Sequence, residues 1–429
     1  MLDSIRKYWD RYIKTIKNIG NYFLASLIPM IISMVTSPLF ALYLEPEDYA
    51  IISFYTSFNS LLTPFVLFYF NQYYMREYFY RDDAGRETLR AVIFKSFIYF
   101  SGILWIVSCL GLVAYMMFFN KDSSVPIFPY VIISLLPLFF SGIYRLEIID
   151  YKVQRKSSAY LKLSLYYAIL TALFSIAFVV LAQWHALGRI LGTMSGPLII
   201  FIYLLNKNKA LFKVKFNWTI FKQSVVFCYP LVIAAMLTFF SNGYEKVILE
   251  RHVDLALLGI YSIGVSFSNY LHVFSTALND TFSPDIFEAL AKKEFRRVAK
   301  ISLLQLGIMA VIVVFFILFA KWIVLILTAG RYLDSTPIAR IACLAMLTSG
   351  LYSIISCIVY AYKKTKLFLY AKILGSIACV VMFNVLIMHF GIIGAAWGHV
   401  LSHFVMFVML TLLFVFNMKV QPSTKSADS

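Results

Sequence analysis

Residues 301–327 read ISLLQLGIMAVIVVFFILFAKWIVLIL, an apolar run whose single charged residue is Lys321. About 20 mostly apolar residues in a helix are enough to cross the hydrocarbon core of a bilayer. A helix is expected because backbone groups in hydrocarbon must pair within their own segment. The run therefore predicts a membrane-spanning helix.

Stretches of the same kind fill the chain almost from end to end. The chain has 429 residues, of which 61% are hydrophobic, and its mean hydropathy is +0.80. Soluble domains are nearer half apolar, so the excess indicates lipid as the solvent. We expect an all-α polytopic membrane protein with twelve transmembrane helices in two six-helix lobes around a central cavity. The predicted spans are residues 20–43, 49–73, 91–119, 128–149, 160–183, 187–205, 224–249, 255–281, 301–327, 337–362, 367–389 and 391–417.

The domain organisation follows from a Lys-rich segment near the middle of the chain, which separates six spans from six. Weak internal similarity supports a repeat, because Pro29 matches Pro230 and residues 49–53 (YAIIS) resemble residues 258–262 (LGIYS). Two such halves place a substrate site at their interface and work by rocking against each other. The predicted segments are an interfacial amphipathic helix at 1–18, an N-terminal lobe at 19–206, a basic linker at 207–223, a C-terminal lobe at 224–417 and a tail at 418–429.

Lys and Arg are concentrated in alternate gaps between the predicted spans, which predicts the orientation. One set of gaps contains three of these residues, Lys121, Arg251 and Arg331. The other set, with the two chain ends, contains twenty-seven: Arg6, Lys7, Arg11, Lys14, Lys17, Arg76, Arg81, Arg86, Arg90, Lys152, Arg155, Lys156, Lys207, Lys209, Lys213, Lys215, Lys222, Lys292, Lys293, Arg296, Arg297, Lys300, Lys363, Lys364, Lys366, Lys419 and Lys425. Cytoplasmic loops carry the excess of Lys and Arg, so both chain ends are expected in the cytoplasm.

The net charge of +17 does not indicate nucleic-acid binding, because the cations are spread over short membrane-flanking segments. Topology and contacts with anionic membrane lipids explain most of the excess. The first apolar run is too long for a cleavable signal peptide and lacks a small-residue cleavage pattern. All five cysteines fall inside predicted spans, where small thiols pack well, so no redox role is expected: Cys109, Cys228, Cys343, Cys357 and Cys379.

Enzymatic and metal-binding motifs are missing from the sequence. It contains no nucleotide-binding glycine loop and no nucleophile elbow. His399 and His403 have a spacing that suits a metal on one helix face, but no carboxylate lies in their span. We therefore expect buried or pore-lining histidines, no metal and no cofactor.

Ionisable and polar residues inside the spans are the candidates for a substrate site, since a charge in hydrocarbon is costly unless it is paired or faces water. The cationic candidates are Arg145, Arg189, Lys246 and Arg340. The polar candidates, which either line a sugar path or hydrogen-bond between helices, are Asn59, Asn242, Asn269, His272 and Asn384. The excess of cations favours a phosphate or pyrophosphate ligand, which Arg binds through several donors. Glu245 and Glu147 are candidates for coupling transport to a proton or cation gradient.

Four stretches resemble Wzx-type polysaccharide flippases of the bacterial multidrug/oligosaccharidyl-lipid/polysaccharide exporter superfamily. Residues 44–50 (LEPEDYA) are similar to the family's Leu-Ser-Pro-Glu-(Asp/Glu)-Tyr-Gly between the first two spans. Residues 245–249 (EKVIL) followed by 258–262 (LGIYS) are similar to Asp-Arg-x-x-Leu…Val-Gly-Ile-Tyr-Ser. Residues 363–366 (KKTK) resemble the basic tetrad after the tenth span, and Asn384 with 391–396 (GIIGAA) resembles Leu-Asn…Gly-Ile-x-Gly-Ala-Ala.

The resemblance implies export of an undecaprenyl-pyrophosphate-linked oligosaccharide from the cytoplasmic to the periplasmic leaflet, for O-antigen, capsule or exopolysaccharide synthesis. It also implies a location in the bacterial cytoplasmic (inner) membrane and makes other polysaccharide-assembly proteins candidate partners. The chain departs from the family at Leu42, where many members carry Arg, and at Ala50 in place of Gly. Without that Arg, a pyrophosphate contact would have to come from Lys246, Arg145 or Arg340.

Two other functions compete with a flippase. A membrane glycan polymerase or ligase usually needs a sizeable extracytoplasmic loop, whereas the outside gaps here have the length of plain connections. A cation-coupled drug antiporter of the same superfamily should have an acidic cavity, whereas these spans lean basic. A structural membrane scaffold ranks last because it needs no embedded charges.

Overall fold

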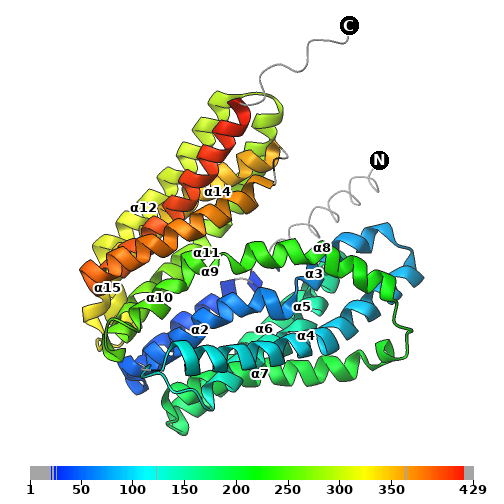
Figure 1. Cartoon of the computed structure of the whole chain (residues 1–429), viewed down its shortest axis with the longest axis horizontal. Helices are drawn as coiled ribbons and strands as arrows, with labels where there is room; N and C mark the ends of the chain where they lie inside the picture. The colour runs from blue at the N-terminus through cyan, green and yellow to red at the C-terminus, as the bar shows by residue number, and fades with distance from the viewer. Residues whose placement is uncertain are drawn as a thin grey trace, which may run out of the picture. The chain divides into compact units, whose positions relative to one another are not determined.

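The computed structural model describes residues 21, 24, 25, 27–121, 123–362, 364 and 366–419. The predicted amphipathic helix at 1–18 and nearly all of the predicted tail lie outside them. Every regular element within the described residues is a helix (Figure 1), which confirms the all-α class. The helices that the text uses are α2 (Pro46–Leu67), α3 (Phe70–Glu77), α4 (Asp83–Phe119), α5 (Tyr130–Val153), α6 (Ser157–Ile176), α7 (His185–Lys207), α8 (Trp218–Met236), α9 (Phe239–Asn242), α10 (Tyr244–Leu249), α11 (Leu255–Ala291), α12 (Phe295–Leu327), α13 (Thr336–Ala342), α14 (Ala345–Ala361) and α15 (Lys366–Lys419).

The apolar runs of the sequence form helices long enough to cross a membrane. Among the described residues, ten helical stretches meet that criterion by length and composition, and Leu27–Tyr43 is a shorter apolar helix. The longest stretch, Lys366–Asn417, contains the last two predicted spans. It is two helices joined at Gly391, whose φ of 53° and ψ of −132° are outside the helical region and suit only glycine. Each of the twelve predicted spans therefore falls on one of these stretches.

Contacts between Cα atoms divide the chain into two compact units. Unit 1 comprises residues 1–45 and 58–236, and unit 2 comprises residues 46–57 and 237–429. The division falls inside α2, so that the first turns of this helix belong to unit 2. α8, which begins the predicted seventh span, belongs to unit 1.

In unit 1, close packing of α6 against α7 depends on glycines spaced four residues apart. A Cβ added to Gly192 would lie 2.3 Å from the Cα of Ser175, and one added to Gly196 would lie 2.3 Å from Oγ1 of Thr171. Small residues at this spacing let helix backbones approach closely within a membrane. The core of this unit is rich in aromatic side chains, among them Phe70, Phe94 and Phe97.

The connection between α2 and α3 is a break in the predicted second span. Phe68 and Tyr69 both have left-handed backbones, with φ of 52° and 51°, a conformation that is rare for bulky residues. The Tyr69 carbonyl accepts a hydrogen bond from Sγ of Cys228 at 3.4 Å. The last residues of this span, 70–73, therefore belong to a separate helix, α3.

In unit 2, the start of α2 packs against the start of α11, and the two segments of the sequence repeat meet there. Oγ of Ser53 lies 2.6 Å from Oγ of Ser262, and these are equivalent positions of the two similar pentapeptides. A Cβ added to Gly259 would lie 1.8 Å from the Pro46 carbonyl oxygen, so only glycine allows this approach. Asp254, which precedes α11, accepts a hydrogen bond from the Leu257 amide through its side chain, as expected of a helix N-cap.

Candidate functional site

The segment that follows α8 is irregular where the sequence predicts a continuous seventh span. α8 ends at Met236, and Gly243, with φ of −158° and ψ of −27°, separates α9 from α10. Side chains of α15 form hydrogen bonds with this segment. Two of them bind its backbone: Ser376 Oγ donates to the Leu237 carbonyl at 3.0 Å, and Ser402 Oγ donates to the Ser241 carbonyl at 2.9 Å. Two others bind its side chains: Lys372 Nζ donates to Oγ1 of Thr238 at 2.6 Å, and Asn384 Nδ2 donates to the Tyr244 hydroxyl at 3.1 Å. Non-helical backbone at membrane depth is tolerated where neighbouring helices supply such partners.

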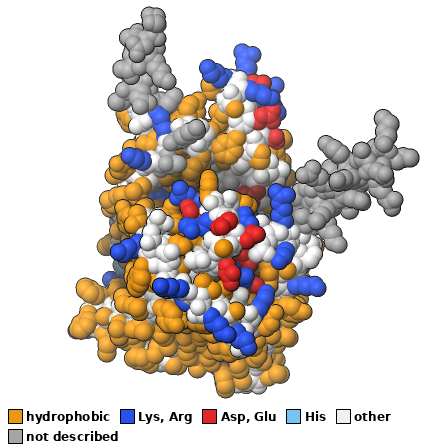
Figure 2. All heavy atoms as spheres, turned by 90° about the vertical axis from the view of Figure 1, so that its right-hand side faces the viewer, with side chains coloured by type: hydrophobic (Ala, Val, Ile, Leu, Met, Phe, Trp, Pro, Cys, Tyr) orange, Lys and Arg blue, Asp and Glu red, His pale blue; other side chains and the backbone are white. Residues whose placement is uncertain are grey.

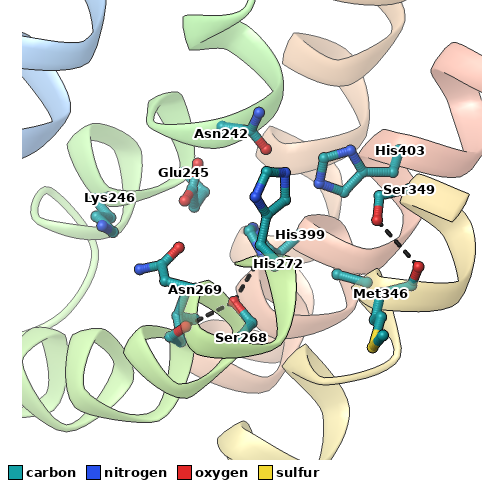
Figure 3. A pocket seen from close by; sticks show the side chains of 12 residues that line it. Asn242, Glu245, Lys246, Ser268, Asn269, His272, Met346, Ser349, His399 and His403 are labelled. Carbon is teal, nitrogen blue, oxygen red and sulfur yellow. Dashed lines mark hydrogen bonds between the residues drawn. The ribbon is translucent and has the colours of Figure 1, made fainter. Parts of the chain in front are cut away.

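Beside this irregular segment, unit 2 contains a polar cavity of about 250 Å³ (Figure 3). Its lining comes from four parts of the unit: α9 and α10, α11, α14, and the second half of α15. The lining residues are Asn242, Glu245, Lys246, Val265, Ser268, Asn269, His272, Ala345, Met346, Ser349, His399 and His403. The sequence analysis named five of them as site candidates: Asn242, Glu245, Lys246, Asn269 and His272.

Glu245 is the most unusual group in the cavity lining. Its side chain is fully buried, and neither carboxylate oxygen has a hydrogen-bond partner among the described residues. Burial of an acidic group without partners costs free energy. Lys246, its neighbour in sequence, is half-buried and lines the same cavity.

Histidines form another side of the cavity (Figure 3). The rings of His399 and His403 lie 5.8 Å apart at nearly a right angle. Ser268 Oγ lies 3.4 Å from Nε2 of His399, and Nδ1 of His399 has no partner among the described residues. His272 enters from α11. Within the part of the chain that the structure describes, no group of three or more His, Cys, Asp or Glu is placed to hold a metal ion.

The side chains that line the cavity of unit 2 are mostly polar or ionisable. Amide, hydroxyl and imidazole groups can donate and accept hydrogen bonds, which suits a hydroxyl-rich or hydrated ligand. One carboxylate without partners can accept a proton or a cation. The cavity thus combines polar groups that can orient a ligand with two ionisable groups of opposite charge, Glu245 and Lys246.

The remaining cationic candidates lie elsewhere. Arg340 is exposed on α13 in unit 2 and is not among the cavity-lining residues. In unit 1, Arg145 is exposed on α5, and the guanidinium of Arg189 lies 4.1 Å from the centroid of the Phe40 ring. Of the eleven candidates, the cavity therefore brings together five and leaves these three apart.

Asn59 and Glu147, both in unit 1, are engaged with neighbouring helices. Asn59 Nδ2 donates to the Ser134 carbonyl at 3.1 Å, which is the interhelical use of an asparagine. Glu147 is buried on α5, where its carboxylate lies 2.7 Å from Nη2 of Arg90 and 2.5 Å from Nζ of Lys207. Asp150, one turn further on, lies 3.4 Å from Nη1 of Arg90.

This ion-pair network belongs to a charged end of unit 1. The Tyr74 hydroxyl donates to Oδ1 of Asp150 at 2.5 Å, and Arg90 donates to the side chain of Asn208 at 3.0 Å. Figure 2 shows Lys, Arg, Asp and Glu side chains gathered on this face and bordered by hydrophobic ones. Because two cations hold Glu147, the geometry favours a structural role for it, and Glu245 is the better candidate for coupling.

Sequence reasoning missed the cavity-lining roles of Ser268 and Ser349, whereas it expected His399 and His403 on α15 to be buried or to line a pore. The spacing of His399 and His403 was the available signal, since residues four apart share a helix face. Small hydroxyl residues gave no signal, because most serines in these helices bind their own backbone, as Ser349 Oγ does with the Met346 carbonyl at 3.0 Å.

Fold and cavity together define a polytopic helical membrane protein with the architecture of known lipid and drug transporters. A structure described as lipid II flippase MurJ in an inward closed conformation matches with a TM-score of 0.69 and 16% identity, over 93% of this chain and 87% of that chain. An inward-facing multidrug resistance MATE family transporter of the MOP superfamily matches with a TM-score of 0.64 and 14% identity, over 94% and 96% of the two chains. An outward-facing member of that family gives 0.60 and 12% identity, over 95% and 97%. At these identities the likeness establishes the fold.

The family is established by sequence. The model of the family described as "Polysaccharide biosynthesis protein" matches residues 15–290, which is more than half of the chain. The chain belongs to this family. No curated protein matches the sequence.

Proposed function

We propose that the protein is a flippase that moves an undecaprenyl-pyrophosphate-linked oligosaccharide from the cytoplasmic to the periplasmic leaflet of the bacterial inner membrane, by alternating access. The observation that carries the proposal is that a polysaccharide biosynthesis family member has the fold of a lipid II flippase. The positive-inside distribution of Lys and Arg supports cytoplasmic chain ends. We propose no chemical reaction on the cargo.

The polar cavity of unit 2 supports a coupled mechanism. Export against a gradient needs an energy source, which a transmembrane proton or cation gradient supplies, and a buried carboxylate that binds and releases that ion in each cycle couples the gradient to transport. We assign this role to Glu245, because it lines the cavity and its carboxylate has no hydrogen-bond partner among the described residues. Lys246 and the polar lining residues then contact the cargo or its counter-ion.

Complementation of surface glycan tests the cargo class. In a strain lacking the protein, we expect surface glycan to be lost and lipid-linked oligosaccharide to accumulate. Lys246→Glu should not restore display, whereas Lys300→Glu, an exposed position on α12 outside the cavity, should restore it. Arg340, the sequence candidate that lies outside the cavity, is tested in the same way by Arg340→Glu, and unchanged display at unchanged protein level in both variants would remove Lys246 and Arg340 from the site.

The same strain separates the alternatives. Normal glycan together with increased drug sensitivity would favour a drug antiporter. Normal display of glycan with altered chain length would favour a polymerase or ligase. Either result would contradict the flippase proposal.

Reconstitution tests the coupling role. In vesicles with a fluorescent lipid-linked oligosaccharide, an imposed proton or sodium gradient should accelerate flipping by the wild type but not by Glu245→Gln. The matched control is Glu288→Gln, because Glu288 is half exposed and paired with Lys292 at 2.5 Å on the same unit. Gradient dependence retained in Glu245→Gln would exclude this residue as the coupling group.

A further inference from the structure

Unit 1 has a cavity that the proposed function does not use, at the place where α3 and α8 pack against each other. Its volume is about 570 Å³. The residues that line it are Tyr73, Arg76 and Glu77 of α3 and Lys222, Gln223, Val226 and Phe227 of α8. Its lining therefore combines charged, polar and apolar side chains.

Two cations from different helices, Arg76 and Lys222, line this cavity. The guanidinium of Arg76 lies 4.8 Å from the centroid of the Phe227 ring, a cation–π contact that holds this α3 side chain over α8. Lys222 is exposed, and the described residues contain no ion pair to it. Tyr73 also lines the cavity, and its hydroxyl donates to Oε1 of Gln223 at 3.3 Å.

One carboxylate, that of Glu77, also lines the cavity. Its Oε2 lies 3.5 Å from Nη2 of Arg81, and its Oε1 lies 3.9 Å from Nε of Arg76. Arg81 is the closer partner and compensates this charge. The cavity thus retains the positive charge of Arg76 and Lys222.

An exposed apolar face of α8 leads away from these cations. Val226, Tyr229 and Ile233 follow Lys222 at intervals of four, seven and eleven residues, which places all four on one side of the helix. The three apolar side chains are 66%, 52% and 48% exposed. At 1.5 Å per residue, the distance from Lys222 to Ile233 along the helix is about 16 Å, close to the roughly 15 Å depth of one leaflet's hydrocarbon.

We propose that Arg76 and Lys222 bind the anionic phosphate head group of a lipid whose hydrocarbon chain lies along Val226, Tyr229 and Ile233. Charge complementarity selects the phosphate, and the match between the apolar face and one leaflet selects a lipid over a soluble phosphate. Two lipids share this chemistry, an anionic bilayer phospholipid and a polyprenyl phosphate. The site does not depend on the proposed flipping activity, because binding can be measured without transport.

Native mass spectrometry of the full chain in detergent tests the site by titration with phosphatidylglycerol, undecaprenyl phosphate or inorganic phosphate. In Arg76→Ala/Lys222→Ala we expect roughly 30-fold weaker binding of a phosphorylated lipid, since each cation near a membrane surface contributes about 1 kcal/mol. The control is Lys209→Ala/Lys213→Ala, which removes two exposed cations of unit 1 that do not line the cavity. Arg76→Lys/Lys222→Arg should retain most of the binding.

The three titrations distinguish a bilayer phospholipid, a polyprenyl phosphate and free phosphate as the ligand of this site. Loss confined to phosphatidylglycerol, or to undecaprenyl phosphate, supports the site and identifies its occupant. Equal affinity in the two double-alanine variants would overturn the proposal. Inorganic phosphate bound as tightly as either lipid would overturn it too, because the apolar face of α8 would then contribute nothing. The exposed positions of both cations make unchanged thermal stability the expected check on folding.

Discussion

Replacement of Gly192 by Ala tests whether α6 and α7 are held together by the close approach of their backbones. The added Cβ would lie 2.3 Å from the Cα and 2.6 Å from the amide nitrogen of Ser175. Carbon atoms in good contact are about 3.5–4.0 Å apart. The two helices would therefore have to separate locally by more than about 1 Å, since backbone atoms cannot rotate away as a side-chain end can.

The size of the effect follows from two opposed contributions. Overpacking of a well-packed site costs about 1–3 kcal/mol, and contact with backbone places Gly192→Ala near the upper part of that range. Ala in place of Gly in a helix returns about 1 kcal/mol. The net destabilisation is about 1–2 kcal/mol, which for a domain of some 200 residues lowers the unfolding midpoint by roughly 2–8 °C.

Thermal unfolding in detergent, followed by intrinsic fluorescence and by retention of the monodisperse species, measures this shift. The matched control is Gly111→Ala on α4, where an added Cβ would meet nothing within 4 Å. The helix-propensity gain is then unopposed, and the midpoint should stay equal or rise slightly. If Gly192→Ala and Gly111→Ala shift the midpoint equally, close backbone approach does not stabilise this helix pair.

Two further substitutions test features of single units. Arg90→Ala leaves the buried carboxylates of Glu147 and Asp150 without the cation they share, and should destabilise the protein by about 3–5 kcal/mol. Lys292→Ala, which breaks an exposed pair with Glu288, should cost at most about 1 kcal/mol, and similar midpoints for the two variants would contradict the structural role of the network. Gly391→Ala forces a Cβ into a backbone region that suits only glycine, so a loss of about 1–3 kcal/mol is expected. An unchanged midpoint would mean that the two helices of α15 can join in another way.

Hydropathy predicts the helical spans of this fold because an apolar run of sufficient length is stable in lipid only as a helix. Each predicted span falls on a helical stretch, and even the break between the last two spans lies at Gly391, where the prediction places it. The irregular course of the seventh span was not predicted. Its cause is tertiary, since Leu237 and Ser241 carbonyls are satisfied by side chains of α15, far away in sequence.

The candidate site was predicted in part for the same reason. Asn242, Glu245 and Lys246 stand out as polar groups in an apolar run, and the cavity contains all three. Arg340 satisfies the same criterion, yet it lies on the outside of its unit. A single helix gives the depth of a residue but not the direction of its side chain, because that depends on which neighbours cover each face.

The shared helix α2 has a mechanical consequence. The chain passes from one unit to the other three times, and only one of these crossings, between residues 57 and 58, lies within a continuous helix. One end of this rod is anchored to α11 through Ser53 and Ser262, and the other terminates at the left-handed pair Phe68 and Tyr69. Because α2 also contains Pro64, which removes a backbone hydrogen bond from the helix interior, twisting of this segment would concentrate at Pro64 and at the left-handed pair that follows it.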